Sequence, residues 1–330
     1  MALLEVRDLQ VHFRTATSVN RAVDGLSFDI NAGEALAIVG ESGCGKSVTS
    51  MALLRLLPEP PGKVAGQILF RGQDLMKASE RRMRQLRGDE ISMIFQEPMT
   101  SLNPVFTIGQ QIGESVRLHE NASRTVARNR AIEMLQLVGI PSPEQRVDEY
   151  PHQLSGGMRQ RAMIAIALAC NPALLVADEP TTALDVTIQA QILDLMQDLR
   201  RKVGSAVMLI THDLGVVAEF AERVLVMYAG RKVEEASVTD LFRTPRHPYT
   251  QGLLNALPKL GSSLGDGAAV RLAEIPGRVP DMSKPLTGCA FAERCPMAQD
   301  ACRRIEPALE QKADRHFAAC HFAARGAFVA

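Results

Sequence analysis

The sequence lacks an excess of charge of either sign. Its 330 residues contain 37 Lys and Arg against 37 Asp and Glu, so the formal net charge is +0. A protein whose main partner is nucleic acid usually carries a basic excess or a basic stripe. The composition therefore gives no electrostatic argument for nucleic acid as a partner.

Long apolar runs are also missing. No uninterrupted stretch approaches the roughly 20 apolar residues that a helix needs to span a bilayer. The longest candidate, residues 162–169, is predicted to be a buried helix. The first five residues show no basic segment that leads into an apolar core, so no signal peptide is expected. We therefore expect a cytoplasmic chain that reaches a membrane only through a partner.

The strongest positive signal is a glycine-rich loop. An apolar segment, residues 35–39, is followed by Gly40-Glu41-Ser42-Gly43-Cys44-Gly45-Lys46-Ser47 and then, from Val48 on, by a helix-forming stretch. This order of strand, loop and helix is what a phosphate-binding loop requires, because the loop N–H groups and the helix N-terminus both attract phosphate. Lys46 would reach the β- and γ-phosphates, and Ser47 would bind Mg²⁺. The alternative, an ordinary glycine-rich turn, is disfavoured by this context.

Two adjacent carboxylates, Asp178 and Glu179, end a second apolar segment at residues 174–177. At the end of a strand, Asp178 could hold Mg²⁺ and Glu179 could polarise an attacking water. A solvated turn would explain two such acids on their own, but not their combination with a phosphate loop.

A second helix start follows Leu154, in the order Ser155-Gly156-Gly157. It is a common helix cap, yet it also prepares an anion site. One chain cannot readily bring two such helix ends to one phosphate, whereas two copies in head-to-tail order can.

The remaining pattern predicts an α/β protein. Alternating residues at 4–13 and 22–30 suggest edge strands of an antiparallel lobe, and further strands are expected at 91–95, 207–211 and 224–228. Apolar residues at helical spacing between about 103 and 139 indicate a helical insertion. Beyond Tyr249, Gly and Pro become frequent, which indicates a linker into a small irregular C-terminal module.

Taken together, these motifs resemble, in order and spacing, the nucleotide-binding subunit of ATP-binding cassette (ABC) transporters. The resemblance implies a P-loop NTPase cassette with a RecA-like parallel sheet core, an antiparallel β lobe and an inserted helical subdomain. It implies a nucleotide-binding domain over residues 1–250, with the helical subdomain at about 97–158, and an accessory domain over 251–330.

The same resemblance assigns roles to further residues. Gln96 corresponds to the glutamine that senses Mg²⁺ and communicates with the transmembrane partner, and Asp185 belongs to a loop that contacts the opposing subunit. His212 corresponds to the switch histidine that faces the γ-phosphate. Phe13 is expected to stack on adenine, where many relatives have tyrosine.

Three more segments, residues 96–104, 246–250 and 275–280, look like the dipeptide/oligopeptide/nickel (Dpp/Opp-like) branch of bacterial importers. This implies an ATPase peripheral to the cytoplasmic face of the inner membrane. Its partners would be two transmembrane permease subunits, a second ATPase subunit (a paralogue or a copy of itself) and a periplasmic or lipoprotein solute-binding protein. Two rivals are a soluble ABC ATPase acting in DNA repair or translation, for which no arms or second cassette are visible, and a redox-sensing regulatory ATPase.

Four of the six cysteines, Cys289, Cys295, Cys302 and Cys320, crowd the C-terminal segment, while Cys44 and Cys170 lie far upstream. In a reducing compartment metal binding explains such a cluster better than disulfides. The spacings lack the tight Cys pair usual for zinc, so from the residues alone zinc, iron–sulfur and unmetallated cysteines all stay open. Relatives in the branch carry a similar cluster, which implies a [4Fe–4S] centre, with His316 and His321 keeping Zn²⁺ as the alternative. We expect this module to be remote from the Lys46 loop.

Overall fold

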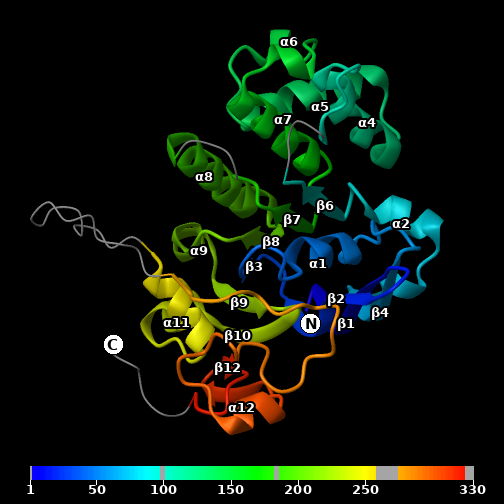
Figure 1. The fold of residues 1–330 in the computed structure, drawn as a ribbon. Helices are drawn as coiled ribbons and strands as arrows, with labels where there is room; N and C mark the ends of the chain where they lie inside the picture. The colour runs from blue at the N-terminus through cyan, green and yellow to red at the C-terminus, as the bar shows by residue number, and fades with distance from the viewer. Residues whose placement is uncertain (1, 97–100, 182–185, 258–273, 324–330) are drawn as a thin grey trace, which may run out of the picture.

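The computed structural model describes residues 2–96, 101–181, 186–257 and 274–323. In these residues the chain forms two sheets, with helices around them (Figure 1). The helical elements are α1 Lys46–Leu53, η1 Leu75–Lys77, α2 Glu80–Leu86, α4 Ile108–Glu120, α5 Arg124–Leu137, α6 Pro143–Arg146, η2 Pro151–Gln153, α7 Gly156–Leu168, α8 Val186–Val203, α9 Leu214–Phe220, α10 Val238–Arg243, α11 Pro248–Asn255 and α12 Asp300–Arg304.

The smaller sheet is antiparallel and has the strand order β2-β1-β4-β5. Its strands are β1 Leu4–Arg14, β2 Val19–Ile30, β4 Gly62–Phe70 and β5 Gln73–Asp74. The prediction of an antiparallel lobe is confirmed, but the prediction that β1 is an edge strand is wrong. Strand β1 pairs with β2 on one side and with β4 on the other. Strand β4 contains Gly62 and Gly66 and gave no comparable alternation of apolar and polar residues.

The larger sheet has the order β11-β12-β10-β9-β3-β8-β7-β6. Its strands are β3 Ala35–Val39, β6 Ile91–Ile94, β7 Leu174–Asp178, β8 Ala206–Thr211, β9 Arg223–Tyr228, β10 Arg231–Ser237, β11 Glu310–Ala313 and β12 His316–Ala318. The five strands from β9 to β6 run parallel, which confirms the parallel core. Every residue of β3, β7 and β8 is buried, because neighbouring elements cover both faces of the sheet.

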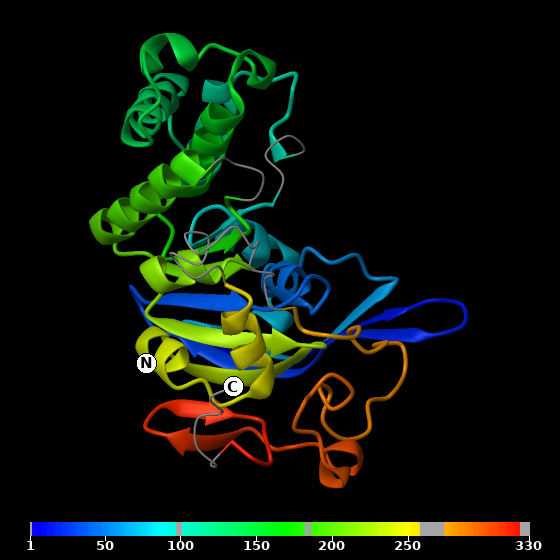
Figure 2. The ribbon, with the colours of Figure 1, turned by 60° about the vertical axis from the view of Figure 1, so that its left-hand side comes forward.

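Helices α4 to α7 form a separate layer above the sheets (Figures 1 and 2). Helix α4 begins at a capping box in which the Thr107 and Gln110 side chains each accept from the other's backbone N–H. Its buried face, Ile108, Ile112 and Val116, packs in one cluster with residues of α5 and α7. The predicted helical insertion is therefore confirmed for the described residues. None of the described helices is long and apolar enough to cross a bilayer.

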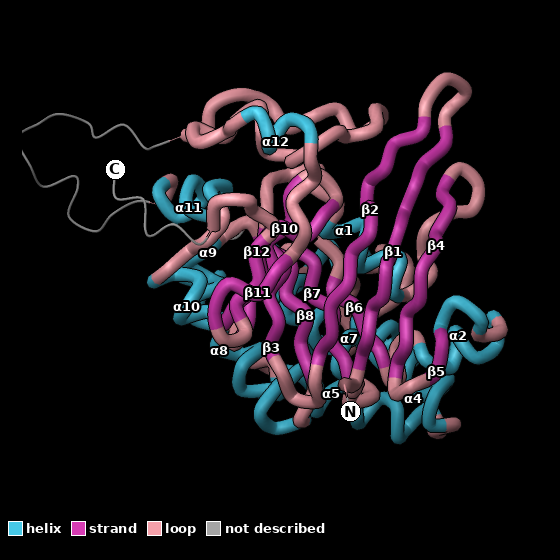
Figure 3. Tube along the Cα trace, turned by 90° about the horizontal axis from the view of Figure 1, so that it is seen from below, coloured by secondary structure: helices cyan, strands magenta, loops and turns pink. Residues whose placement is uncertain are grey.

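The C-terminal segment is less irregular than predicted. Strands β11 and β12 extend the larger sheet, because β12 pairs antiparallel with β10 at Glu234 and Glu235 (Figure 3). Phe291 joins a hydrophobic cluster that includes residues of β9, β10 and α11. The C-terminal module thus shares both a sheet and a core with the cassette. These short strands carry mostly polar residues, which is why their sequence gave no strand signal.

Candidate nucleotide site

The phosphate loop has the predicted geometry. It leaves β3 at Gly40 and enters α1 at Lys46, and Gly45 precedes the helix with φ 103°. A Cβ at Gly45 would lie 2.3 Å from the Ala22 carbonyl oxygen, and one at Gly40 would lie 2.3 Å from that of Met227. Only glycine allows the loop to approach these two backbones while turning its N–H groups inward.

Lys46 is buried at the base of this loop. Its Nζ donates to the carbonyl oxygens of Gly40 at 2.7 Å and Glu41 at 3.1 Å. Both acceptors belong to the loop, so the ammonium group is held over the space that the loop encloses. A phosphate entering that space would offer Lys46 a charged acceptor in addition to neutral carbonyls.

Asp178 lies at the end of β7 and faces α1. Its two carboxylate oxygens accept from Ser47 Oγ at 3.0 Å and from Ser50 Oγ at 3.3 Å. Burial raises the pKa of Asp178, while the Ser47 hydrogen bond lowers it. The oxygens of Asp178 and Ser47 therefore meet at one point, and a hard divalent cation there would have the ligands it prefers and would stabilise the ionised carboxylate.

Glu179 occupies a strained backbone position with φ 46°. Its N–H donates to the Ile210 carbonyl at 2.8 Å, which fixes the turn after β7. The carboxylate accepts from Gln96 Nε2 at 3.0 Å and lies 3.2 Å from His212 Nδ1. Three side chains from the ends of β6, β7 and β8 are thus brought together, although they are far apart in sequence.

Most of these groups line one cavity of about 330 Å³, which is in the range of small-molecule sites. Asp178 and His212 are not among the lining residues, but they contact Ser47 and Glu179, which are. Its lining contains the predicted residues Phe13, Ser42, Gly43, Gly45, Lys46, Ser47, Val48, Gln96 and Glu179. Cys44 is fully buried behind the loop, and burial raises the pKa of its thiol, so it is a packing residue there.

Sequence reasoning missed several members of this site. Asn20, Ala22 and Met282 also line the cavity, and Ser50 supports Asp178. Ser50 follows Ser47 by one helical turn, so helical spacing could have found it. Met282 has no local signal in the sequence, because a contact across the chain places it there: its backbone carbonyl accepts from the Arg21 N–H of β2 at 3.1 Å.

The remaining predicted residues lie apart from the cavity. Ser155 caps α7, where its Oγ accepts from the Met158 N–H at 3.3 Å. Ser155 and Gly156 are exposed, and Gly157 is partly exposed. None of the three is among the residues that line the cavity. Asp185 lies outside the described residues.

The four C-terminal cysteines come together around a second, smaller cavity of about 20 Å³. Cys289, Cys295, Cys302 and Cys320 all line it, with His247 and His321 beside them. Burial raises the pKa of the Cys289 thiol to about 11, and it also raises the pKa of the Cys295 and Cys320 thiols. Among the described residues, no group of three or more His, Cys, Asp or Glu side chains is arranged as a metal site. His316 is not available to such a site, since it contacts the buried Glu234 at 2.7 Å.

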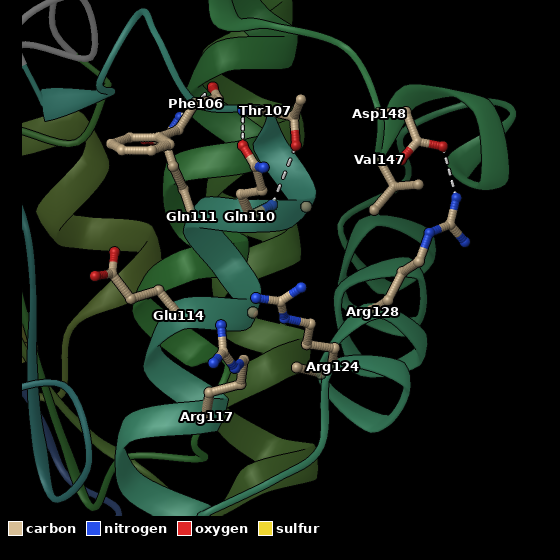
Figure 4. A pocket seen from close by; sticks show the side chains of 13 residues that line it. Phe106, Thr107, Gln110, Gln111, Glu114, Arg117, Arg124, Arg128, Val147 and Asp148 are labelled. Atoms are coloured by element: carbon tan, nitrogen blue, oxygen red, sulfur yellow. Dashed lines mark hydrogen bonds and ion pairs between the residues drawn. The ribbon is translucent and has the colours of Figure 1, made fainter.

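A third cavity, of about 550 Å³, opens between α4 and α5 (Figure 4). Arg117 and Arg124 extend between the two helices, and Arg128 pairs with Asp148 at 2.6 Å. Phe106, at its upper end, is 48% exposed. This cavity belongs to the helical layer and lies apart from the phosphate loop (Figure 1).

Comparisons with known proteins agree with these motifs. Residues 23–182 match the family described as "ABC transporter", and residues 233–302 match "Oligopeptide/dipeptide transporter, C-terminal region". The chain is 59% identical over 319 residues to the "Probable peptide ABC transporter ATP-binding protein y4tR" of Sinorhizobium fredii, covering 96% of this chain and 94% of that protein. It is 51% identical to the "Dipeptide transport ATP-binding protein DppD" of Escherichia coli, covering 98% and 97%.

A third relative, the "Oligopeptide transport ATP-binding protein OppD" of Bacillus subtilis, is 54% identical, with 96% of this chain and 87% of that protein covered. Among solved structures, the fold is similar to a "post-hydrolysis state of the ATP-binding cassette MJ0796 bound to ADP and Pi", which is described as dimeric. The TM-score is 0.64 at 26% identity, and the match covers 71% of this chain and 98% of that one.

Proposed function

Because this chain belongs to the family of ABC transporter ATP-binding subunits, we propose that it hydrolyses ATP to power a bacterial importer of di- or oligopeptides. The observation that carries this proposal is the single cavity in which Lys46, Ser47 and Glu179 converge. The ATPase activity itself follows from the family. The peptide substrate is supported by the names of the relatives and by the C-terminal family match.

In the proposed mechanism, the loop from Gly40 to Val48 binds the phosphates and Phe13 stacks on the adenine. Ser47, Asp178 and Gln96 would hold Mg²⁺, whose charge stabilises the phosphate oxygens. Glu179 orients the attacking water and is itself oriented by Gln96. His212, 60% exposed and next to Glu179, is available to the γ-phosphate. Catalysis is then mainly positioning and charge stabilisation.

We further propose that two ATPase subunits enclose each ATP in head-to-tail order. The support is that Ser155, Gly156 and Gly157 form an exposed helix start away from their own chain's cavity. A second copy, or a paralogue, would bring that helix start and Asp185 to the bound nucleotide. Closure on ATP and reopening after hydrolysis would supply the mechanical step, at the cytoplasmic face of the inner membrane.

The permease would dock on the helical layer near Gln96. The cavity between α4 and α5 supports this, because it combines the exposed Phe106 with Arg117 and Arg124 (Figure 4). An acidic amphipathic segment of a permease would fit these side chains. The solute-binding protein would act on the far side of the membrane.

We propose a domain division with the cassette over residues 1–250, its helical subdomain at about 97–158, and an accessory module over residues 251–330. For that module we propose a metal centre held by Cys289, Cys295, Cys302 and Cys320. The chemistry of the donor set fits, since four thiols line one cavity, and a bound cation would reverse the effect of burial on the pKa values of Cys289, Cys295 and Cys320.

The cavity between the cysteines has room for about one water-sized particle. A [4Fe–4S] cluster therefore requires the thiol-bearing loops to separate, whereas Zn²⁺ does not. We propose iron–sulfur on the resemblance, with zinc as the other outcome. Such a centre would tie together loops that have little core of their own.

The ATPase proposal is tested with purified protein and its permease partners in lipid vesicles. Mg·ATP hydrolysis should depend on Lys46, and Lys46→Ala should reduce it at least about a hundredfold. Peptide uptake should require the same residue. ATP hydrolysis that survives Lys46→Ala would contradict the site, and hydrolysis without peptide uptake would contradict the substrate.

The permease surface is tested by reversing charge in the cavity between α4 and α5. The double variant Arg117→Glu, Arg124→Glu should keep nucleotide binding and lose permease-stimulated hydrolysis. Arg84→Glu, a reversal at an exposed residue of α2, is the control. Equal stimulation in all three proteins would place the contact elsewhere.

The metal centre is tested by anaerobic purification and metal analysis. An iron–sulfur centre predicts a brown protein that absorbs near roughly 400 nm, with about four irons per chain, and Cys302→Ser should remove the colour. One zinc and no iron would decide for zinc. If no metal is found and the accessory module still resists protease, the four cysteines are packing residues.

A further inference from the structure

Two C-terminal segments that carry the resemblance to peptide importers, residues 246–250 and 275–280, supply no group to the nucleotide chemistry described above. Neither does the loop from Cys289 to Cys295. In the structure Tyr249 and Arg294 both bond to Glu41 of the phosphate loop, and the segment 275–280 holds Arg294. The expectation that the module is remote from this loop is therefore wrong. The folding of β12 and Phe291 against the cassette brings them together.

The main contact is a bidentate ion pair. Arg294 donates through Nη1 to Glu41 Oε2 at 2.6 Å and through Nη2 to Glu41 Oε1 at 2.9 Å. The Arg294 side chain is only 5% exposed, and that of Glu41 is 26% exposed. Paired, parallel hydrogen bonds of this kind fix orientation as well as distance, which a lysine could not reproduce.

Contacts with the segment 275–280 also hold the Arg294 side chain in place. Its Nε donates to the Pro276 carbonyl at 2.9 Å, and Nη2 also donates to the Ile275 carbonyl at 3.1 Å. A Cβ at Gly277, which has φ 85°, would lie 3.1 Å from Arg294 Cγ. The segment 275–280 therefore forms a close-fitting cradle for the guanidinium group. Nη1 donates in addition to Tyr228 Oη at 3.3 Å.

A second contact holds the backbone of Glu41. The Glu41 N–H donates to Tyr249 Oη at 2.8 Å. Tyr249 is fully buried, and its ring packs against Tyr228 at 4.7 Å and Phe291 at 5.4 Å between ring centroids. The hydroxyl that accepts from the loop is therefore carried by a rigid aromatic cluster.

The same residue also touches the catalytic lysine. The Glu41 carbonyl is one of the two carbonyl acceptors of Lys46 Nζ. Glu41 thus has its side chain fixed by Arg294, its N–H fixed by Tyr249, and its carbonyl bonded to Lys46. A change in its position would alter the acceptors of Lys46 and the start of the loop that carries the phosphate-facing N–H groups.

We propose that Arg294 and Tyr249 are positioning residues for the phosphate loop, so that the C-terminal module sets the conformation in which the loop receives the nucleotide. This rests on the proposed nucleotide site. Neither residue lines the nucleotide cavity. Their loss should therefore leave the reacting groups in place and add the cost of ordering the loop to each binding event.

The test measures the Kd for Mg·ATP, and KM and kcat for hydrolysis, on the full-length chain with its partners. Arg294→Met should raise Kd and KM about tenfold and change kcat by less than about threefold, because the transition-state groups are retained. The Kd and KM of Arg294→Lys should lie between those of the wild type and those of Arg294→Met. Arg303→Met is the matched control, since Arg303 lies in the same module and pairs with the exposed Glu293. It should stay within about twofold of the wild type.

A second pair of variants protects the test against misfolding of the module. Glu41→Gln changes only the cassette side, and Tyr249→Phe removes only one hydroxyl; each should raise Kd several-fold. In a double-mutant cycle, Glu41→Gln should cost little once Arg294→Met is present. Thermal unfolding and protease digestion of each variant report whether the module stays folded. If Arg294→Met unfolds the module, the Kd values of Glu41→Gln and Tyr249→Phe test the inference in its place.

Wild-type Kd in Glu41→Gln and Tyr249→Phe would overturn the inference, as would additive effects in the cycle or an equal loss in Arg303→Met. A fall in kcat at unchanged KM would also overturn it. A wild-type chain that does not bind Mg·ATP at all would instead overturn the proposed function.

Discussion

We propose that two helix N-termini in this chain bind phosphate, and their surroundings differ. The start of α1 at Lys46 lines a cavity together with residues of β1 and β2 and with Gln96 and Glu179, which follow β6 and β7, and Lys46 and Asp178 are both buried. The start of α7 at Ser155 is exposed, and an added Cβ at Gly156 would meet nothing within 4 Å. The start of α1 lines a cavity, whereas the start of α7 lies on the surface. The difference is what the proposed head-to-tail pair requires, in which a second subunit meets the α7 end.

The two termini also differ in how their backbone is satisfied. Helix α1 has no side-chain cap, and its N-cap Gly45 is left-handed. Helix α7 is capped by Ser155 Oγ. An uncapped, enclosed helix end keeps its N–H groups for a ligand. At α7, one of these donors already has a partner.

The largest expected effect comes from the enclosed end. Glu179→Gln should bind ATP normally and hydrolyse it at least about a hundredfold more slowly, because the water loses its orienting carboxylate. Turnover is measured with the permease partners, and trapped dimers by light scattering. Wild-type turnover in this variant would remove Glu179 from its role and break the comparison.

The next effect concerns the exposed end. Ser155→Arg should leave nucleotide binding by the monomer within about twofold but weaken ATP-dependent association more than about thirtyfold, since a bulky cation would block a shared phosphate site. Ser79→Arg, at the cap of α2, is the matched control. If the monomer itself loses ATP binding, Ser155 serves its own chain and the two ends are not different in kind.

A smaller effect is expected at the support of Asp178. Ser50→Ala removes the hydroxyl that holds one carboxylate oxygen, so the Mg²⁺-dependent part of ATP affinity should fall roughly three- to tenfold. Binding measured with Mg²⁺ chelated is the internal control and should not change. An equal loss under both conditions would mean that Ser50 supports only the helix.

The smallest effect is on stability. Ser155→Ala should lower the free energy of unfolding by about 1 kcal/mol through loss of the α7 cap, while Ser155→Asn should retain it. Chemical denaturation of the monomer measures both. No difference between Ala and Asn would show that the cap does not stabilise α7, leaving association as the function of Ser155.

Most of the enclosed site could be predicted from the sequence, because each of its elements is local. A phosphate loop needs glycines and Lys46 at fixed spacing, and Asp178 and Glu179 must follow a buried strand. The roles of Gln96 and His212 came only from the resemblance to a family. The structure adds that both contact the Glu179 carboxylate.

The C-terminal module could not be predicted in the same way. Its strands are short and polar, and Met282 and Arg294 stand in segments with no periodicity. What brings them to the nucleotide loop is pairing across the chain, between β12 and β10 and between Arg294 and Glu41, 253 positions apart. Contacts between residues so far apart produce no recognisable spacing pattern in the sequence.

The sequence by itself determined the nucleotide chemistry, since the residue types that bind phosphate and Mg²⁺ must recur at short, fixed distances around one loop and one strand end. Only the tertiary structure decided that the C-terminal module fixes Glu41. The side chains and carbonyls that hold Glu41 come from β9, α11 and two loops, and only the packing of Tyr228, Tyr249 and Phe291 into one core gives them a common location.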